Sequence, residues 1–245
     1  MIFSRYSTSS DSNSDTDEAE DVNNNTKHRI FRASLAFVPE FGWSKKTLTY
    51  GAEAAGFPRL AHGMFPNGPA DLISFFYQDC NSQLGEILKQ NVEQLTENGE
   101  KPKTKEFVRN AVEVRLRMLV PYIHKWPQAM AIQTLPQNAV QSWSNLSDLV
   151  DEIWYHAGDR STDFNWYTKR MSLAAVYKST EITMVQDKSD DFNHTWSFLD
   201  RRLDNLVDFG NTLRKAQDTN SDFSNIFKGT LIMAQNVLGM NNRFR

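Results

Sequence analysis

The apolar residues of this chain recur at helical spacing almost throughout, and this pattern constrains its fold more than any other feature. From His28 onward they return every three or four residues, in segments that end at glycine or proline. We find no sustained alternation of apolar and polar residues of the kind that marks a half-buried β-strand. The sequence therefore predicts an all-α protein. With 40% apolar residues in a length of 245, the chain can bury a sizeable core.

Breaks in this periodicity divide the chain into four regions. After an N-terminal tail, three short helices punctuated by glycine should form a helix-turn-helix-type unit. The strong break at Asn67-Gly68-Pro69 then begins a body of long helices, which a last amphipathic helix follows. We place the tail, the unit, the body and the last helix at residues 1–27, 28–66, 67–217 and 218–245, in that order.

The tail combines two compositions. Met1 to Ser10 is rich in hydroxyl residues, lacks acid and contains one arginine, which is similar to a remnant of a mitochondrial transit peptide. Asp11 to Asn25 consists mostly of Asp, Glu, Ser and Asn, so it cannot bury enough apolar surface to offset the entropy of ordering. We therefore predict that the tail is disordered.

Capping and breaking residues predict the helices of the body. Near its end, a seam of apolar residues in steps of three and four is typical of a helix packed on another helix: Trp196, Leu199, Leu203, Leu206, Gly210 and Leu213. The expected helices cover about residues 69–95, 104–121, 126–135, 138–156, 163–186 and 192–217.

Few residues suggest catalysis. Glu152 and His156 share a helical face, but no second carboxylate–histidine pair completes a di-iron set. Neither a glycine-rich phosphate loop nor a nucleophile elbow is present. The one cysteine, Cys80, lies in an apolar stretch and should be a buried thiol. We predict that the chain is not an enzyme and has no cofactor.

Two sets of motifs resemble known families. Phe41-Gly42-Trp43, Ala54-Ala55-Gly56 and Met64-Phe65-Pro66 resemble the N-terminal block of TetR-family repressors. Motifs in the second half are similar to the eukaryotic accessory proteins of coenzyme Q (ubiquinone) biosynthesis. They are Arg115-Leu116-Arg117-Met118-Leu119, Pro121-Tyr122-Ile123, Trp126-Pro127, Asp151-Glu152-Ile153-Trp154, His156-Ala157-Gly158-Asp159 and the run from Ser161 to Arg170.

This second resemblance implies a TetR-repressor-like fold that binds lipid rather than DNA. The implied protein is a homodimer on the matrix side of the inner mitochondrial membrane. It would hold an isoprenoid or phospholipid and help the di-iron demethoxy-ubiquinone hydroxylase to reach its polyprenyl substrate.

The resemblance also assigns a docking surface for the hydroxylase. Residues three and four apart share a helical face, and tryptophan, tyrosine and arginine dominate interface hot spots. On the residues alone, Trp166 is equally well an ordinary core residue. The predicted docking residues are Asp151, Ile153, Trp154, Asp163, Trp166, Tyr167 and Arg170.

Apolar stripes of the long helices could line a tunnel for the lipid tail. On the residues alone, such stripes are usually plain core. The TetR body normally encloses a ligand cavity, so the resemblance favours a lipid site. The predicted lining residues are Leu72, Phe76, Cys80, Leu84, Leu119, Ile123, Leu146, Leu173 and Val176.

The last helix has a broad apolar face and, from Phe223 onward, three cations and no acid. Such a helix is typical of one that lies in a membrane interface. The alternative is a helix packed on its own domain or across the dimer. The predicted membrane residues are Phe223, Ile226, Phe227, Leu231, Val237 and Leu238.

A ligand-responsive, TetR-like DNA-binding regulator is the alternative function. Its recognition helix would contain Arg59 and His62, with Lys45 and Lys46 near phosphate. A formal net charge of −3 and so few donors argue against nucleic acid as a partner. A pure scaffold without a lipid site is a third possibility.

Overall fold

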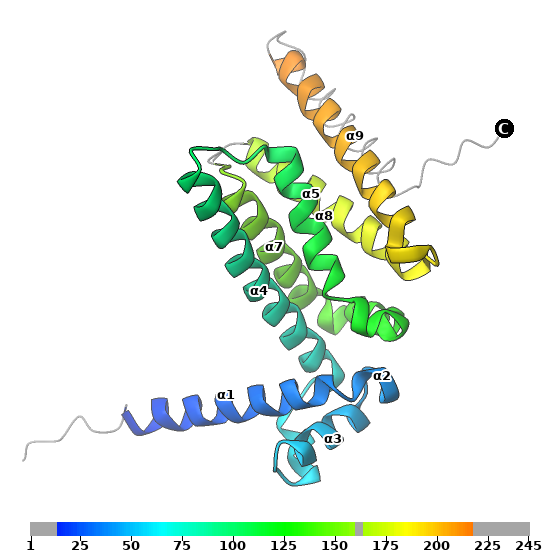
Figure 1. The fold of residues 1–245 in the computed structure, drawn as a ribbon. Helices are drawn as coiled ribbons and strands as arrows, with labels where there is room; N and C mark the ends of the chain where they lie inside the picture. The colour runs from blue at the N-terminus through cyan, green and yellow to red at the C-terminus, as the bar shows by residue number, and fades with distance from the viewer. Residues whose placement is uncertain (1–13, 160–163, 218–245) are drawn as a thin grey trace, which may run out of the picture. The chain divides into compact units, whose positions relative to one another are not determined.

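The structure is a computed structural model that describes residues 14–159 and 164–217. These residues form helices joined by turns and contain no β-strand (Figure 1). The all-α prediction is therefore confirmed over this part of the chain. Contacts divide the chain into two compact units, residues 1–75 and 76–245. The first unit extends past the predicted boundary at residue 66 because Phe75, in the first turns of helix α4 (Pro69–Glu97), stacks on Phe31.

The first unit begins with helix α1 (Ser14–Leu35), so the predicted disorder does not hold from Ser14 onward. The buried Ile30 and Phe31 anchor the later turns of α1, and a helix that has already formed extends at little cost. Composition alone ignores this coupling along the chain. The elements that follow are α2 (Val38–Phe41), α3 (Lys45–Ala54) and the 3-10 helix η1 (Arg59–Met64).

Two local features bring α3 against α1. Gly42 ends α2 with a φ of 66°, a left-handed conformation that favours glycine. Ser44 then caps α3, because its hydroxyl accepts a hydrogen bond from the N–H of Thr47 at 3.3 Å. The two helices meet so closely that a Cβ on Gly51 would lie 1.9 Å from the Oγ of Ser34.

The second unit consists of the rest of α4 and the elements after it. The bounds of its α-helices agree with the predicted ones to within a few residues. The elements are α5 (Thr104–Arg117), η2 (Val120–Lys125), α6 (Trp126–Gln133), η3 (Pro136–Asn138), α7 (Ala139–His156), α8 (Phe164–Gln186), η4 (Asp190–Phe192) and α9 (Asn193–Gln217).

Helix α9 contacts α5 and α8. Of its predicted seam, Trp196, Leu199 and Leu203 are at most 6% exposed, and Leu206 is half-buried. The side chains of Gly210 and Leu213 lie outside the described part of the chain. Basic residues of α5 also pair with carboxylates of η4 and α9. The pairs are Arg117–Asp191 at 2.7 Å, Arg109–Asp200 at 3.0 Å and Lys105–Asp204. Apolar packing and charge together therefore hold α9 on the body.

The carboxylate of Asp187 organises the start of α9, and we expect its loss of charge to weaken the fold in acid. It accepts hydrogen bonds from the N–H and hydroxyl groups of Ser189 and Thr195, at 2.6–2.8 Å. Burial alone would raise the pKa of Asp187, but these bonds lower that pKa far below its usual range. The folded chain thus resists a proton that the unfolded chain accepts, so stability is lost as pH falls below about 4.

Urea unfolding at about pH 6 and about pH 3 measures this loss. Asp187→Asn should make the free energy of unfolding less sensitive to this change of pH, whereas Asp190→Asn, at an exposed carboxylate nearby, should not. An equal pH dependence in all three proteins would contradict the assignment.

Candidate functional site

Arg170 is the centre of a charged cluster where α7 ends and α8 begins. Its guanidinium lies 4.0 Å from the centroid of the Trp166 ring and pairs with the carboxylates of Asp151 and, at 3.3 Å, Asp159. The Nζ of Lys169 lies 2.6 Å from Asp159 as well. The side chains of Arg170 and Asp159 are only 12% and 6% exposed, so solvent screens the pair between them weakly. The cluster therefore fixes the orientation of the Trp166 ring.

Two exposed side chains extend this cluster into solvent. Tyr167 and Met171 are 65% and 53% exposed, and the Tyr167 ring packs edge-on against Trp166 at 4.7 Å between centroids. Large apolar side chains gathered at the surface often mark an interaction site. We define Asp151, Trp166, Tyr167, Arg170 and Met171 as the α7–α8 surface.

Of the remaining predicted docking residues, two are buried and one lies outside the described residues. Ile153 is fully buried, and Trp154 is 8% exposed, with its Nε1 donating to the carbonyl of Lys169 at 3.2 Å. Both side chains belong to the core face of α7, so they support the α7–α8 surface from beneath. Asp163 lies outside the described residues. Trp166 is half-buried, between the core and docking interpretations.

The predicted lipid-lining residues are buried, except for the half-buried Ile123. Cys80 is among the buried ones, and burial raises the pKa of its thiol. Burial is what both plain core and a closed lipid site require, so the lining role stays a prediction.

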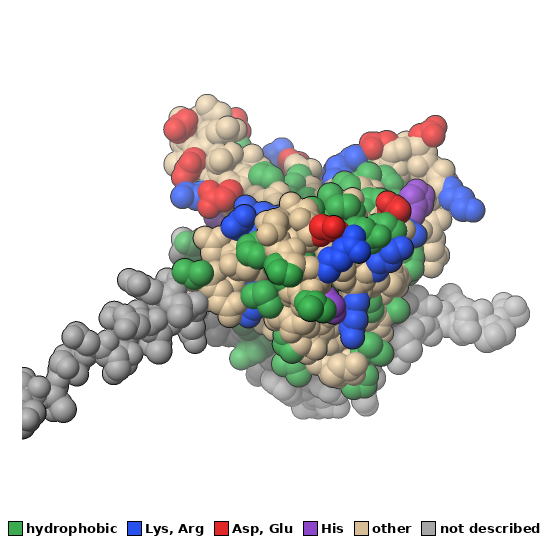
Figure 2. All heavy atoms as spheres, turned by 90° about the horizontal axis from the view of Figure 1, so that it is seen from below, with side chains coloured by type: hydrophobic (Ala, Val, Ile, Leu, Met, Phe, Trp, Pro, Cys, Tyr) green, Lys and Arg blue, Asp and Glu red, His purple; other side chains and the backbone are tan. Residues whose placement is uncertain are grey.

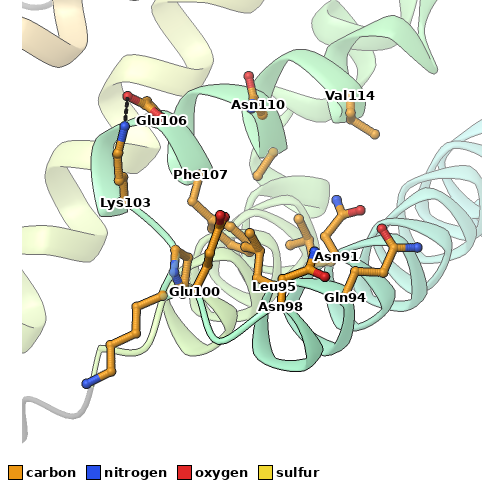
Figure 3. A pocket seen from close by; sticks show the side chains of 14 residues that line it. Asn91, Gln94, Leu95, Asn98, Glu100, Lys103, Glu106, Phe107, Asn110 and Val114 are labelled. Atoms are coloured by element: carbon orange, nitrogen blue, oxygen red, sulfur yellow. Dashed lines mark hydrogen bonds and ion pairs between the residues drawn. The ribbon is translucent and has the colours of Figure 1, made fainter.

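Two pockets occur elsewhere in the second unit. One of about 490 Å³ lies between α4 and α5, with Leu95 and Phe107 on its walls and the amides of Asn91, Gln94 and Asn110 around them (Figure 3). The other, of about 300 Å³, lies between α4 and α7 and contains Glu152 and His156. Neither pocket includes a predicted lipid-lining residue.

The Nε2 of His156 and the Oε1 of Glu152 form a hydrogen bond of 3.0 Å, as the helical spacing of the two residues predicts. Within residues 14–159 and 164–217, no three His, Cys, Asp or Glu side chains form a group that could hold a metal ion.

The interior of the second unit contains a polar centre that sequence reasoning missed. Arg115 on α5 and Glu181 on α8 are both fully buried. The Glu181 carboxylate accepts hydrogen bonds from Tyr77 at 2.8 Å and Trp126 at 3.0 Å. Burial, and then the charge of Glu181, raise the pKa of Tyr77 well above its usual value, so this phenol stays protonated.

The predicted DNA contacts are weak in the first unit. Arg59 donates to both carboxylate oxygens of Glu53, at 2.9 and 3.2 Å, so its charge is already compensated. On the face drawn in Figure 2, acidic and apolar side chains lie among the basic ones. This mixture differs from the continuous basic stripe that nucleic-acid binding favours.

The predicted membrane residues, from Phe223 to Leu238, lie outside the described residues. Among the helices that the structure describes, none combines the length and apolar character that crossing a bilayer requires.

Comparison with known proteins places these features in a family. A family model of COQ9 matches residues 139–210, which include the α7–α8 surface, and a model of the "Ubiquinone biosynthesis protein COQ9, N-terminal domain" matches residues 23–53.

Curated relatives match most of the chain. The "Ubiquinone biosynthesis protein COQ9, mitochondrial" of Rattus norvegicus is 41% identical over 235 residues, which cover 95% of this chain and 75% of the relative. The Homo sapiens protein of the same name is 42% identical over 219 residues, or 89% and 69% of the two chains. That of Drosophila melanogaster is 41% identical over 212 residues, or 86% and 64%. The resemblance predicted from the motifs is thus confirmed, and the chain belongs to the COQ9 family of mitochondrial ubiquinone biosynthesis proteins.

Proposed function

We propose that this chain is a non-catalytic accessory protein that presents a polyprenyl quinone intermediate to the demethoxy-ubiquinone hydroxylase at the inner mitochondrial membrane. The observation that supports docking best is the α7–α8 surface, where Tyr167 and Met171 are exposed beside the Arg170–Trp166 stack. The names of the relatives support the pathway.

The α7–α8 surface has the properties of an interface centre. Its aromatic and arginine side chains are the types that contribute most binding energy, and Arg170 already contacts the Trp166 ring and two carboxylates. Ion pairs within the surface satisfy the charges of Arg170 and Asp151. Docking a partner therefore buries aromatic ring faces and the Met171 side chain, and it does not require the desolvation of an unpaired charge.

A lipid carrier in this pathway has a clear physical advantage. Moving a polyprenyl tail through water costs about 0.8 kcal/mol for each exposed CH₂ group. A body that encloses the tail and rests on the membrane avoids this cost. The homodimer and the membrane helix at residues 218–245, implied by the family resemblance, belong to this proposal.

We expect Tyr167→Glu to weaken binding to the hydroxylase at least about tenfold, because it places a charge where an aromatic ring should be buried. Titration of the purified hydroxylase against the immobilised chain measures the affinity. Leu60→Glu is the matched control, since Leu60 is 82% exposed on η1, away from α7 and α8 in the sequence. Equal affinity of both variants and the wild type would refute docking through this surface.

A further inference from the structure

Arg115 is a buried cation with an incomplete set of hydrogen bonds. Its side chain is fully buried on α5 and lies 4.8 Å from the centroid of the Tyr77 ring. The Nε donates to the Oδ1 of Asn81 at 3.0 Å. Among the residues that the structure describes, neither Nη1 nor Nη2 has a hydrogen-bond partner. Buried polar groups are normally hydrogen-bonded, so two free guanidinium nitrogens require an explanation.

The nearby carboxylate of Glu181 does not supply these bonds. Its oxygens accept from Tyr77, Trp126 and Lys178 instead. Together, Arg115, Lys178 and Glu181 leave the centre with one more positive charge than negative. The unpaired guanidinium therefore favours an acceptor with negative charge or a strong dipole.

Tyr177 provides a second free donor beside the first. It is fully buried on α8, and its hydroxyl has no hydrogen-bond partner among the described residues. Burial raises the pKa of Tyr177, while the charge of Arg115 acts in the opposite direction, as expected for close neighbours. The phenol thus remains protonated and able to donate. Apolar residues close to members of this centre in the sequence, Phe76 on α4 and Leu173 and Val176 on α8, are buried as well.

A purely structural role explains this arrangement poorly. A buried charge generally costs more in desolvation than its contacts return, and apolar replacements of similar volume are often as stable or more stable. Small-ligand sites, by contrast, are apolar enclosures with a few convergent polar groups that fix the orientation of the ligand.

We propose that Arg115 and Tyr177 form a head-group subsite that donates hydrogen bonds to an electron-rich oxygen of an apolar ligand. The oxygen is a carbonyl or phenolic oxygen of a quinone-type ring, or a phosphoryl oxygen of a phospholipid; both chemistries match the same donors. This inference rests on the proposed lipid-binding function and adds the polar end of the site. Because Arg115 is fully buried, the ligand enters when the helices around the centre separate, which makes binding slow.

The test uses the full chain and two probes, decylubiquinone and dihexanoylphosphatidylcholine. Equilibrium binding, followed by tryptophan fluorescence, is measured for the wild type, Arg115→Met and Tyr177→Phe. Loss of hydrogen bonds to a charged group should weaken binding of the recognised probe about 10- to 100-fold in Arg115→Met, and less in Tyr177→Phe. Arg109→Met, a part-exposed arginine of the same helix, is the matched control and should bind as the wild type does.

Stability distinguishes the subsite from a structural role. If Arg115 serves a ligand, Arg115→Met should unfold at a urea concentration equal to or above that of the wild type. Tyr177→Phe keeps the buried ring and provides a second test if Arg115→Met does not fold. Weakened decylubiquinone binding would identify the quinone ring, whereas weakened binding of dihexanoylphosphatidylcholine alone would identify the phosphate.

Two results would overturn the proposal, and they differ in whether the proposed lipid function survives. Unchanged affinity of both probes for both variants would refute the subsite and leave the proposed lipid function in place. A wild type that binds neither probe would overturn the lipid function and the subsite together.

Discussion

Glu181→Ala should lower the free energy of unfolding by about 3–5 kcal/mol, the cost of removing one partner from a buried charged network. The fully buried carboxylate accepts from the hydroxyl of Tyr77, the Nε1 of Trp126 and the Nζ of Lys178. Its removal would take away the acceptor that these three donors share, and would remove a carboxylate whose charge acts on Arg115. Urea unfolding followed by far-UV circular dichroism measures the loss.

A comparison of two substitutions at Glu181 separates the effect of losing the charge from the effect of losing the side chain. Glu181→Gln keeps an acceptor oxygen and should cost less than Glu181→Ala. Glu86→Ala, at an exposed glutamate of α4, should change stability by less than about 0.5 kcal/mol. A loss below about 1 kcal/mol in Glu181→Ala would mean that the buried donors find other acceptors, and would contradict the network as described.

Gly51→Ala should destabilise the first unit by about 1–3 kcal/mol, although alanine is normally the better helix former. A Cβ at this position would lie 1.9 Å from the Oγ of Ser34 and 2.6 Å from its Cα. The side-chain oxygen could rotate away, but the Cα can move only with the backbone of α1. The helices must therefore separate, and the buried side chains between them, such as Ile30 and Leu48, lose contact.

Gly63→Ala is the matched control for this prediction. A Cβ on Gly63 would meet nothing within 4 Å, and its backbone does not adopt the left-handed conformation. The urea concentration at the midpoint of unfolding should therefore be nearly unchanged in Gly63→Ala and clearly lower in Gly51→Ala. Equal stability of the two variants would show that the contact between α1 and α3 is looser than the structure indicates.

Helix ends could be predicted from the sequence because the signal lies in the end residues themselves. Gly42 permits a left-handed turn, Ser44 provides a capping oxygen and Pro69 suits the first turn of a helix. Each acts through its own backbone or side chain, so no knowledge of the tertiary structure is needed. The N-terminal tail shows the limit, because its low apolar content does not reveal that it continues into a helix anchored by the buried Ile30 and Phe31.

The α7–α8 surface could be predicted only in part. The pairing of Trp166 with Arg170 follows from helical spacing, and the structure places the two groups in contact. The motif that contains Ile153 and Trp154 does not tell which of its members face outward. Burial of these two residues depends on where the neighbouring helices lie, and local spacing does not provide that information.

The polar centre is visible in the sequence as a charged residue within an apolar stripe, a feature that an analysis of hydrophobic periodicity disregards. Arg115 follows Ala111 by four residues and precedes Leu116, so it falls on the buried face of α5. A charged residue in an apolar stripe is worth noticing for that reason alone. Its neighbour Glu181 lies far along the chain, on α8, and only the fold brings the two helices into one core.

The exposed side chains of the α7–α8 surface have a consequence for the amount of this protein that a cell can keep in solution. Tyr167 and Met171 remain in water whenever no other protein covers them. An uncovered apolar patch is a liability for solubility, because copies of the same chain can meet through it. If this protein is produced in excess of the partner that covers the patch, its copies should self-associate. The abundance of the protein is therefore best matched to that of the partner.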